Sequence, residues 1–127
     1  MNQEKNTLLI IEDEDEIRTL YVEVLRDAGF EMLEAKDGRD GYDKIVSEKW
    51  DLLLLDIMLP SMDGVQILKE MHFANVGEGR PVILLTNLGS ENVINECFNY
   101  GADGYLIKSE ITPDKIVSEV KAFLKKQ

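Results

Sequence analysis

The sequence predicts an α/β fold: a doubly wound, five-stranded parallel sheet with helices on both faces. Three short runs are apolar at every position, as expected of strands that are covered on both sides: Leu8–Ile11, Leu52–Leu55 and Val82–Leu85. Each run is followed by apolar residues spaced three and four apart, which is typical of amphipathic helices. Strands that alternate with helices in this way pair in parallel, with right-handed crossovers.

The first half of the chain contains two strand–helix units. The strand Leu8–Ile11 leads into a helix over residues 17–28, which Gly29 ends. A short, partly polar strand follows at Phe30–Ala35 and suits an edge of the sheet. Asp37-Gly38 predicts a turn before the second helix. The apolar residues that mark the inward face of this helix are Tyr42, Ile45 and Val46.

The second half of the chain contains three more units. Their strands are predicted at Leu52–Asp56, Val82–Thr86 and Tyr105–Ile107. The helices that follow are expected to be capped by Asp63, Ser90 and Thr112, the last of which precedes a proline. The inward-facing residues of these helices are Val65, Leu68, Met71, Val93, Ile94, Cys97, Phe98, Ile116, Val117, Val120, Phe123 and Leu124.

Length and composition favour one domain over residues 1–127, with a core at about 7–124, and we expect a stand-alone protein without an output domain. The net charge of −11 argues against direct nucleic-acid binding, which needs a basic surface. The N-terminus is polar and no run of 18 apolar residues occurs, so we expect neither export nor membrane insertion. A single cysteine, Cys97, agrees with a cytoplasmic location.

Polar residues interrupt the apolar pattern at the carboxyl ends of the predicted strands. Glu12 and Asp13 follow the first strand, and Asp56 ends the third. Thr86 ends the fourth strand and Lys108 follows the fifth. In a parallel sheet these ends meet at one edge, where open α/β sheets bind their ligands. If the first and third strands are neighbours, the three carboxylates share one pocket.

Three clustered carboxylates repel one another, at roughly 4 kcal/mol for each pair about 4 Å apart in an effective dielectric near 20. Such a cluster takes up protons or binds a cation, and oxygen ligands suit Mg²⁺, with Mn²⁺ as an alternative ion. With a cation in place, Asp56 becomes a candidate nucleophile toward phosphorus. Lys108 and Thr86 are candidate contacts for the phosphoryl oxygens.

These motifs together resemble the receiver domain of bacterial two-component response regulators. The motifs are Glu12-Asp13, Asp56-x-x-x-Pro60-x-x-Asp63-Gly64, Thr86 and Tyr105-x-x-Lys108. The resemblance implies a flavodoxin-like fold with strand order 2-1-3-4-5. It also implies a signalling switch in which Asp56 accepts a phosphoryl group from a sensor histidine kinase or a phosphotransfer protein. The chain would catalyse its own phosphoryl transfer and slow dephosphorylation without being a conventional enzyme.

The resemblance also assigns metal ligands. Asp13 and Asp56 would bind Mg²⁺ directly, the backbone carbonyl of Met58 would be a third ligand, and Glu12 would act through water.

The same resemblance names Thr86 and Tyr105 as switch residues. They would change the face made by the fourth helix, fifth strand and fifth helix, where an unidentified downstream protein binds. The sequence departs from the family pattern at Asn87, where a small residue is common, and at Ser109, where proline is usual. Without a proline we expect a trans bond between Lys108 and Ser109, since a cis bond there costs about 2.5–4 kcal/mol.

Three other functions remain open. The first is a receiver-like adaptor that is not phosphorylated and acts by protein contacts alone. The second is an FMN-binding flavodoxin, although the acidic residues after the first strand would repel a phosphate group. The third is a metal-dependent phosphatase, although no second carboxylate lies two residues beyond Asp56.

Overall fold

The computed structural model describes residues 5–87 and 91–125 and confirms the predicted fold class. Five parallel strands form one sheet in the order β2-β1-β3-β4-β5, as the resemblance implied. The elements are β1 (Thr7–Ile11), α1 (Asp15–Asp27), β2 (Glu31–Ala35), α2 (Gly38–Ser47), β3 (Leu52–Asp56), α3 (Gly64–Ala74), β4 (Val82–Thr86), α4 (Glu91–Asn99), β5 (Gly104–Ile107), the 3₁₀ turn η1 (Lys108–Glu110) and α5 (Pro113–Lys125).

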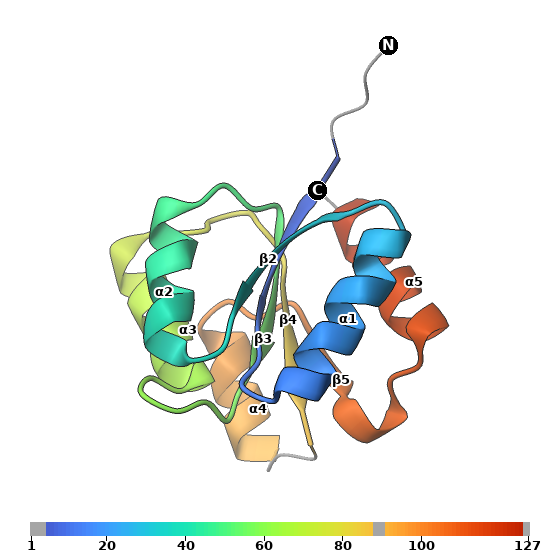
Figure 1. The fold of residues 1–127 in the computed structure, drawn as a ribbon. Helices are drawn as coiled ribbons and strands as arrows, with labels where there is room; N and C mark the ends of the chain where they lie inside the picture. Colours follow the sequence, from blue (N-terminus) through green and yellow to red (C-terminus); the bar gives the residue numbers. More distant parts are fainter. Residues whose placement is uncertain (1–4, 88–90, 126–127) are drawn as a thin grey trace.

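Helices cover both faces of the sheet, with α1 and α5 on one face and α2, α3 and α4 on the other (Figure 1). The leucines of β3 alternate between the two resulting cores. Leu52 and Leu54 pack on the side of α1 and α5, whereas Leu53 and Leu55 pack on the opposite side. All four side chains are fully buried. This two-sided burial explains why all four of these positions are apolar.

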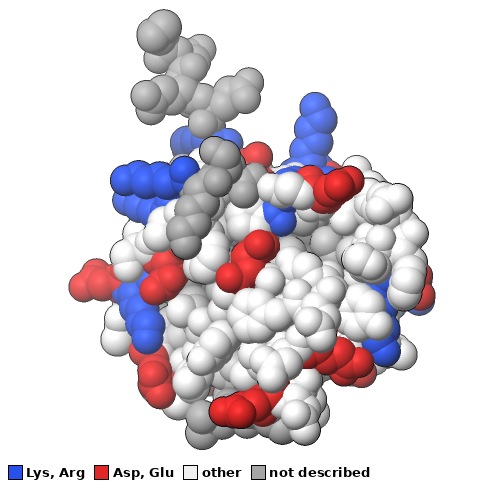
Figure 2. Space-filling model, turned by 180° about the vertical axis from the view of Figure 1, so that it is seen from behind, with Lys and Arg blue, Asp and Glu red and all other residues white. Residues whose placement is uncertain are grey.

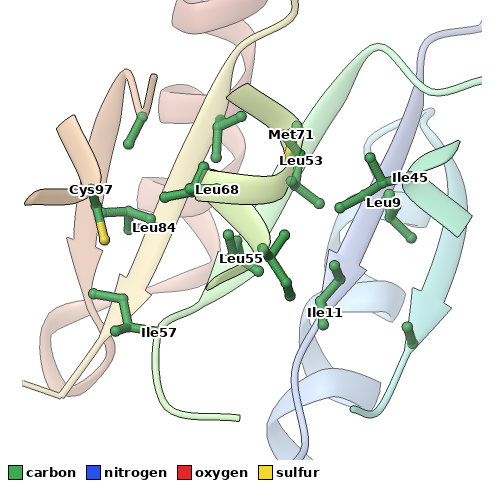
Figure 3. Packing of buried hydrophobic residues seen from close by; sticks show 14 of the residues in the cluster. Leu9, Ile11, Ile45, Leu53, Leu55, Ile57, Leu68, Met71, Leu84 and Cys97 are labelled. Atoms are coloured by element: carbon green, nitrogen blue, oxygen red, sulfur yellow. The ribbon is translucent and has the colours of Figure 1, made fainter. Parts of the chain in front are cut away.

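The larger core lies between the sheet and α2, α3 and α4, and Figure 3 shows its packing. The sheet contributes Leu9, Ile11, Leu53, Leu55 and Leu84, and the helices contribute Ile45, Leu68, Met71 and Cys97. Burial of one such aliphatic side chain stabilises a fold by about 1.5–3 kcal/mol. The sheet is therefore a rigid support for the residues at its carboxyl edge.

The helices begin and end largely as predicted. Asp63 and Gln66 form a capping box at the start of α3, and Thr112 accepts a hydrogen bond from the backbone N–H of Lys115 at 3.2 Å. Gly29 follows α1 with φ of +103°. The longest described helices have 13 residues, and none of the helices that the structure describes is long and apolar enough to cross a bilayer.

Three local predictions need correction. Asp37-Gly38 is the start of α2 rather than a turn, because the Asp37 carboxylate accepts the backbone N–H of the third residue on and caps the helix. Val46 is 56% exposed and Phe98 is 37% exposed, although both were predicted to face inward. Each lies at the margin of its helix's apolar stripe. The predicted cap Ser90 lies outside the described residues.

Candidate functional site

Three carboxylates meet at the carboxyl edge of the sheet. Glu12, Asp13 and Asp56 each offer an oxygen atom, and these atoms lie within 4.8 Å of one another. They meet because β1 and β3 are paired neighbours, with Ile11 opposite Leu55. The residues that follow this pair along both strands therefore share one pocket, as the sequence indicated.

The three acids differ in exposure. Glu12 is fully buried and Asp56 is 3% exposed, whereas Asp13 is exposed. On the outer side, Asp13 lines a largely apolar hollow of about 580 Å³ with residues of the β3–α3 loop and Val93. The pocket therefore has a buried inner wall and an accessible mouth.

Lys108 inserts its ammonium group between the two buried acids. Its Nζ lies 2.6 Å from Glu12 Oε1 and 2.9 Å from Asp56 Oδ2, with Glu14 Oε1 further away at 3.7 Å. Only 4% of the lysine side chain is exposed. No cis peptide bond occurs in the residues that the structure describes, so the bond to Ser109 is trans as predicted.

Burial shifts the acid–base equilibria of the pocket. Loss of hydration raises the pKa of Glu12 to about 7, even though Lys108 and a backbone N–H favour its charged form. Burial likewise raises the pKa of Asp56, against the opposing effect of Lys108. Burial lowers the pKa of Lys108, but the two carboxylates outweigh it and the net shift is upward. Burial is therefore the main reason why the pKa values of both acids lie above their ordinary values.

The backbone beyond Asp56 fixes the position of its carboxylate. The backbone N–H of Met58 donates a hydrogen bond to Asp56 Oδ1 at 3.1 Å. A Cβ atom on Gly64 would lie 2.8 Å from both the Asp56 carbonyl oxygen and the Ile57 Cα atom. Only glycine lets α3 begin this close to the end of β3, which explains the Asp-Gly pair of the motif. The Met58 side chain is 79% exposed, and the ligand role of its carbonyl remains a prediction.

The two residues expected to act as switches lie on β4 and β5. Thr86 is 5% exposed and pairs with Ile107, one residue before Lys108, which brings its backbone beside the pocket. Tyr105 lies on the edge strand and is 47% exposed, with its ring edge-on to that of Phe98 at 6.3 Å. Asn87 is also exposed. The roles of Thr86 and Tyr105 remain predictions.

Sequence reasoning missed Arg18, whose guanidinium contacts the backbone at Glu12 and the side chains of Asp15 and Glu34. The available signal was an arginine three residues after Asp15 in an acidic segment, a spacing that favours ion pairs on a helix. The contact with Glu34 joins α1 to the strand β2, and the spacing of residues within a helix does not indicate a contact with a separate strand.

Comparisons with known proteins identify the family and the fold of the chain. Residues 8–121 match the response regulator receiver domain family. The transcriptional regulatory protein SrrA of Staphylococcus aureus is 37% identical over 121 residues, which are 95% of this chain and 48% of that protein. The chain thus spans about half the length of the curated relatives it matches.

Solved structures with the same architecture include two receiver proteins. A CheY-like response regulator receiver domain protein from Methanospirillum hungatei JF-1 superposes with a TM-score of 0.90 at 28% identity, over 97% of this chain and 96% of that one. The chemotaxis protein CheY4 of Vibrio cholerae gives a TM-score of 0.87 at 26% identity, over 94% and 99%. The family match extends over nearly all the described residues, and the chain therefore belongs to the response regulator receiver domains of two-component systems.

Proposed function

We propose that this receiver domain is a switch operated by phosphorylation of Asp56, with a sensor histidine kinase or a phosphotransfer protein as donor. The observation that carries the proposal is the Asp56 carboxylate, which is 3% exposed and lies 2.9 Å from the Lys108 ammonium in the acidic pocket. Burying this charge after four leucines is costly, and serine or asparagine would end the strand at lower cost. The cost indicates a chemical role.

In the proposed reaction, one oxygen of the Asp56 carboxylate attacks the phosphorus of a phosphohistidine. The new O–P bond forms as the N–P bond of the donor breaks, and the imidazole nitrogen keeps the electron pair and takes up a proton. The Lys108 ammonium is near enough to Asp56 to donate to a phosphoryl oxygen. Thr86 supplies a hydroxyl donor at the neighbouring strand end.

The pocket also fits a divalent cation, which we propose to be Mg²⁺, with Mn²⁺ as an alternative. Its candidate ligands are all oxygen atoms that lie within 4.8 Å of one another, and the ammonium of Lys108 offsets only part of their negative charge. Asp13, Asp56 and the Met58 carbonyl would be direct ligands, and Glu12 would act through water. When bound, the cation supplies positive charge that offsets the carboxylates and the incoming phosphoryl oxygens.

The proposed output surface is the face made by α4, β5 and α5, on the side of the molecule that Figure 2 shows. Charged side chains lie mainly around the edge of this view, and most of its middle is uncharged. Tyr105 and Phe98 expose aromatic surface on β5 and α4. We propose that phosphorylation shifts the population of Thr86 and Tyr105 conformations, so that this face binds a downstream protein in the cytoplasm. Direct nucleic-acid binding is not part of the proposal.

Labelling with a small phosphodonor tests the proposal. Incubation of the wild-type chain with acetyl phosphate and MgCl₂ is expected to add about 80 Da, the mass of one phosphoryl group, as measured by intact mass spectrometry. The Asp56→Asn variant should show no gain. Asp43→Asn, which removes an exposed carboxylate from α2, is the matched control and should be labelled like the wild type.

Two outcomes would contradict the proposal. Labelling of Asp56→Asn at the wild-type level would place the phosphoryl group elsewhere. If the wild-type chain gains no mass with acetyl phosphate and MgCl₂, the result would favour the alternative function, a receiver-like adaptor that acts by protein contacts without phosphorylation.

A further inference from the structure

We propose that Arg18 is a positioning residue for the acidic pocket. Its guanidinium fixes the backbone between β1 and α1, so that Glu12 and Asp13 are held within reach of Asp56. This inference rests on the proposed function, since it concerns the Mg²⁺ affinity of the same pocket.

The guanidinium of Arg18 joins three segments of the chain. Nη1 donates to the backbone carbonyl of Glu12 at 2.8 Å, Nη2 donates to Asp15 Oδ1 at 2.6 Å, and Nε donates to Glu34 Oε1 at 3.1 Å. These partners lie directly after β1, in the first turn of α1 and on β2. The arginine side chain is only 13% exposed, so the bonds are partly shielded from water.

Lys108 holds the Glu12 side chain, but the backbone of the segment between β1 and α1 has few other hydrogen bonds among the described residues. Glu14 precedes α1 as its N-cap, but its side chain forms no capping hydrogen bond. The backbone N–H of Glu14 instead donates to Glu12 Oε2 at 3.0 Å, which ties the pocket carboxylate to the same segment. On the strand side, the Glu12 N–H donates to the Ala35 carbonyl at 3.0 Å. A shift of this backbone would therefore move two of the pocket's three carboxylates.

The shape of arginine matters as much as its charge. The guanidinium is a planar fork with five N–H donors, and three of its nitrogens are used here in three directions. A lysine would keep the positive charge but offers a single nitrogen atom.

A positioning role of Arg18 and a purely electrostatic role predict opposite effects on Mg²⁺ affinity when Arg18 is replaced. A positive charge beside the pocket repels a cation, so a purely electrostatic role predicts tighter Mg²⁺ binding when Arg18 is neutralised. A positioning role predicts weaker binding, because the carboxylates are no longer held together. Loss of a residue that orients metal ligands typically weakens metal binding by 10–100-fold, and we expect roughly tenfold here because Arg18 acts through the backbone.

The experiment compares Arg18→Lys and Arg18→Gln with the wild type by calorimetric titration with MgCl₂, at a temperature where urea denaturation shows each protein to be folded. The Mg²⁺ concentration for half-maximal labelling by acetyl phosphate is measured in parallel. Arg26→Gln is the matched control, because Arg26 is exposed in the last turn of the same helix. The conservative lysine variant keeps the test decisive if the glutamine variant does not fold.

We expect both Arg18 variants to bind Mg²⁺ roughly tenfold more weakly and to need more Mg²⁺ for labelling, while the rate at saturating Mg²⁺ stays close to that of the wild type. Arg26→Gln should bind like the wild type. Unchanged or tighter binding by the Arg18 variants, in a wild-type background that does bind Mg²⁺, overturns the inference alone. A wild-type chain that binds no Mg²⁺ overturns both the inference and the metal-dependent function.

Discussion

The variant Lys108→Met is expected to lose about 3 kcal/mol of unfolding free energy near pH 8 in the absence of metal. The loss follows from leaving Glu12 and Asp56 buried without the ammonium that lies 2.6 and 2.9 Å from their oxygens. Removing one partner of a buried ion pair costs more than the pair itself contributes, because the remaining charge is uncompensated.

The pH dependence gives this prediction a second readout. The folded wild-type chain holds a proton on Glu12 up to a pKa of about 7, whereas the unfolded chain releases it near its ordinary value of 4.5. The contribution of Glu12 to the unfolding free energy of the wild type is therefore fully present below pH 4.5, and it is lost as the pH rises through about 7. In Lys108→Met both carboxyls should stay protonated to higher pH, so the destabilisation should be small near pH 5 and large near pH 8.

Urea denaturation at the two pH values measures this difference. The double variant Lys108→Met with Glu12→Gln is the control, and it should recover part of the loss near pH 8 because only one buried carboxylate remains. An equal loss at both pH values would mean that Lys108 contributes mainly by packing.

The variant Gly38→Ala is expected to be destabilised by about 3 kcal/mol or more, at the upper end of the cost of overpacking. A Cβ atom on Gly38 would overlap the backbone carbonyl of Met62, which cannot rotate away as a side chain can. The same glycine donates its N–H to the Pro60 carbonyl at 3.1 Å, so α2 begins directly against the β3–α3 loop. The substitution must push these two segments apart.

Gly41→Ala, on the same helix, is the matched comparison. The three atoms nearest to its Cβ atom would all belong to the side chain of Ile11, which can move more easily than a backbone carbonyl. Alanine also favours a helix over glycine by about 1 kcal/mol. We expect a clearly smaller loss of stability, measured by urea denaturation. Similar losses for both variants would contradict the importance of the backbone contact at Gly38.

The sequence predicted the fold well because the strongest signals are local. Each of the three central strands contains four consecutive apolar residues, and the β3 leucines report burial on both faces directly. The convergence of Glu12, Asp13 and Asp56 also followed from topology, since parallel strands place their carboxyl ends at one edge. Local pattern and chain order were sufficient for these features.

Features that depend on how side chains from distant segments pack were not predicted. The local pattern does not indicate that Glu12 is fully buried while its neighbour Asp13 is exposed, because the exposure of both residues depends on the direction in which the chain leaves β1. The ion pair of Lys108 with Glu12 joins β1 to the segment after β5, although the lysine itself was identified. Phe98 follows the helical period of α4 but remains partly exposed, since periodicity does not show how far each helix is covered.

Calorimetric titration of the metal-free chain with MgCl₂ near pH 8 tests most directly whether the pocket beside Asp56 holds a divalent cation. We predict saturable binding of a single ion per chain at millimolar or lower concentration, and its loss in Asp13→Asn, which removes the exposed acid of the pocket. An Asp103→Asn variant, altered at the opposite edge of the sheet, should bind like the wild type. No saturable binding at millimolar Mg²⁺, or unchanged binding by Asp13→Asn, would contradict the proposed cation site.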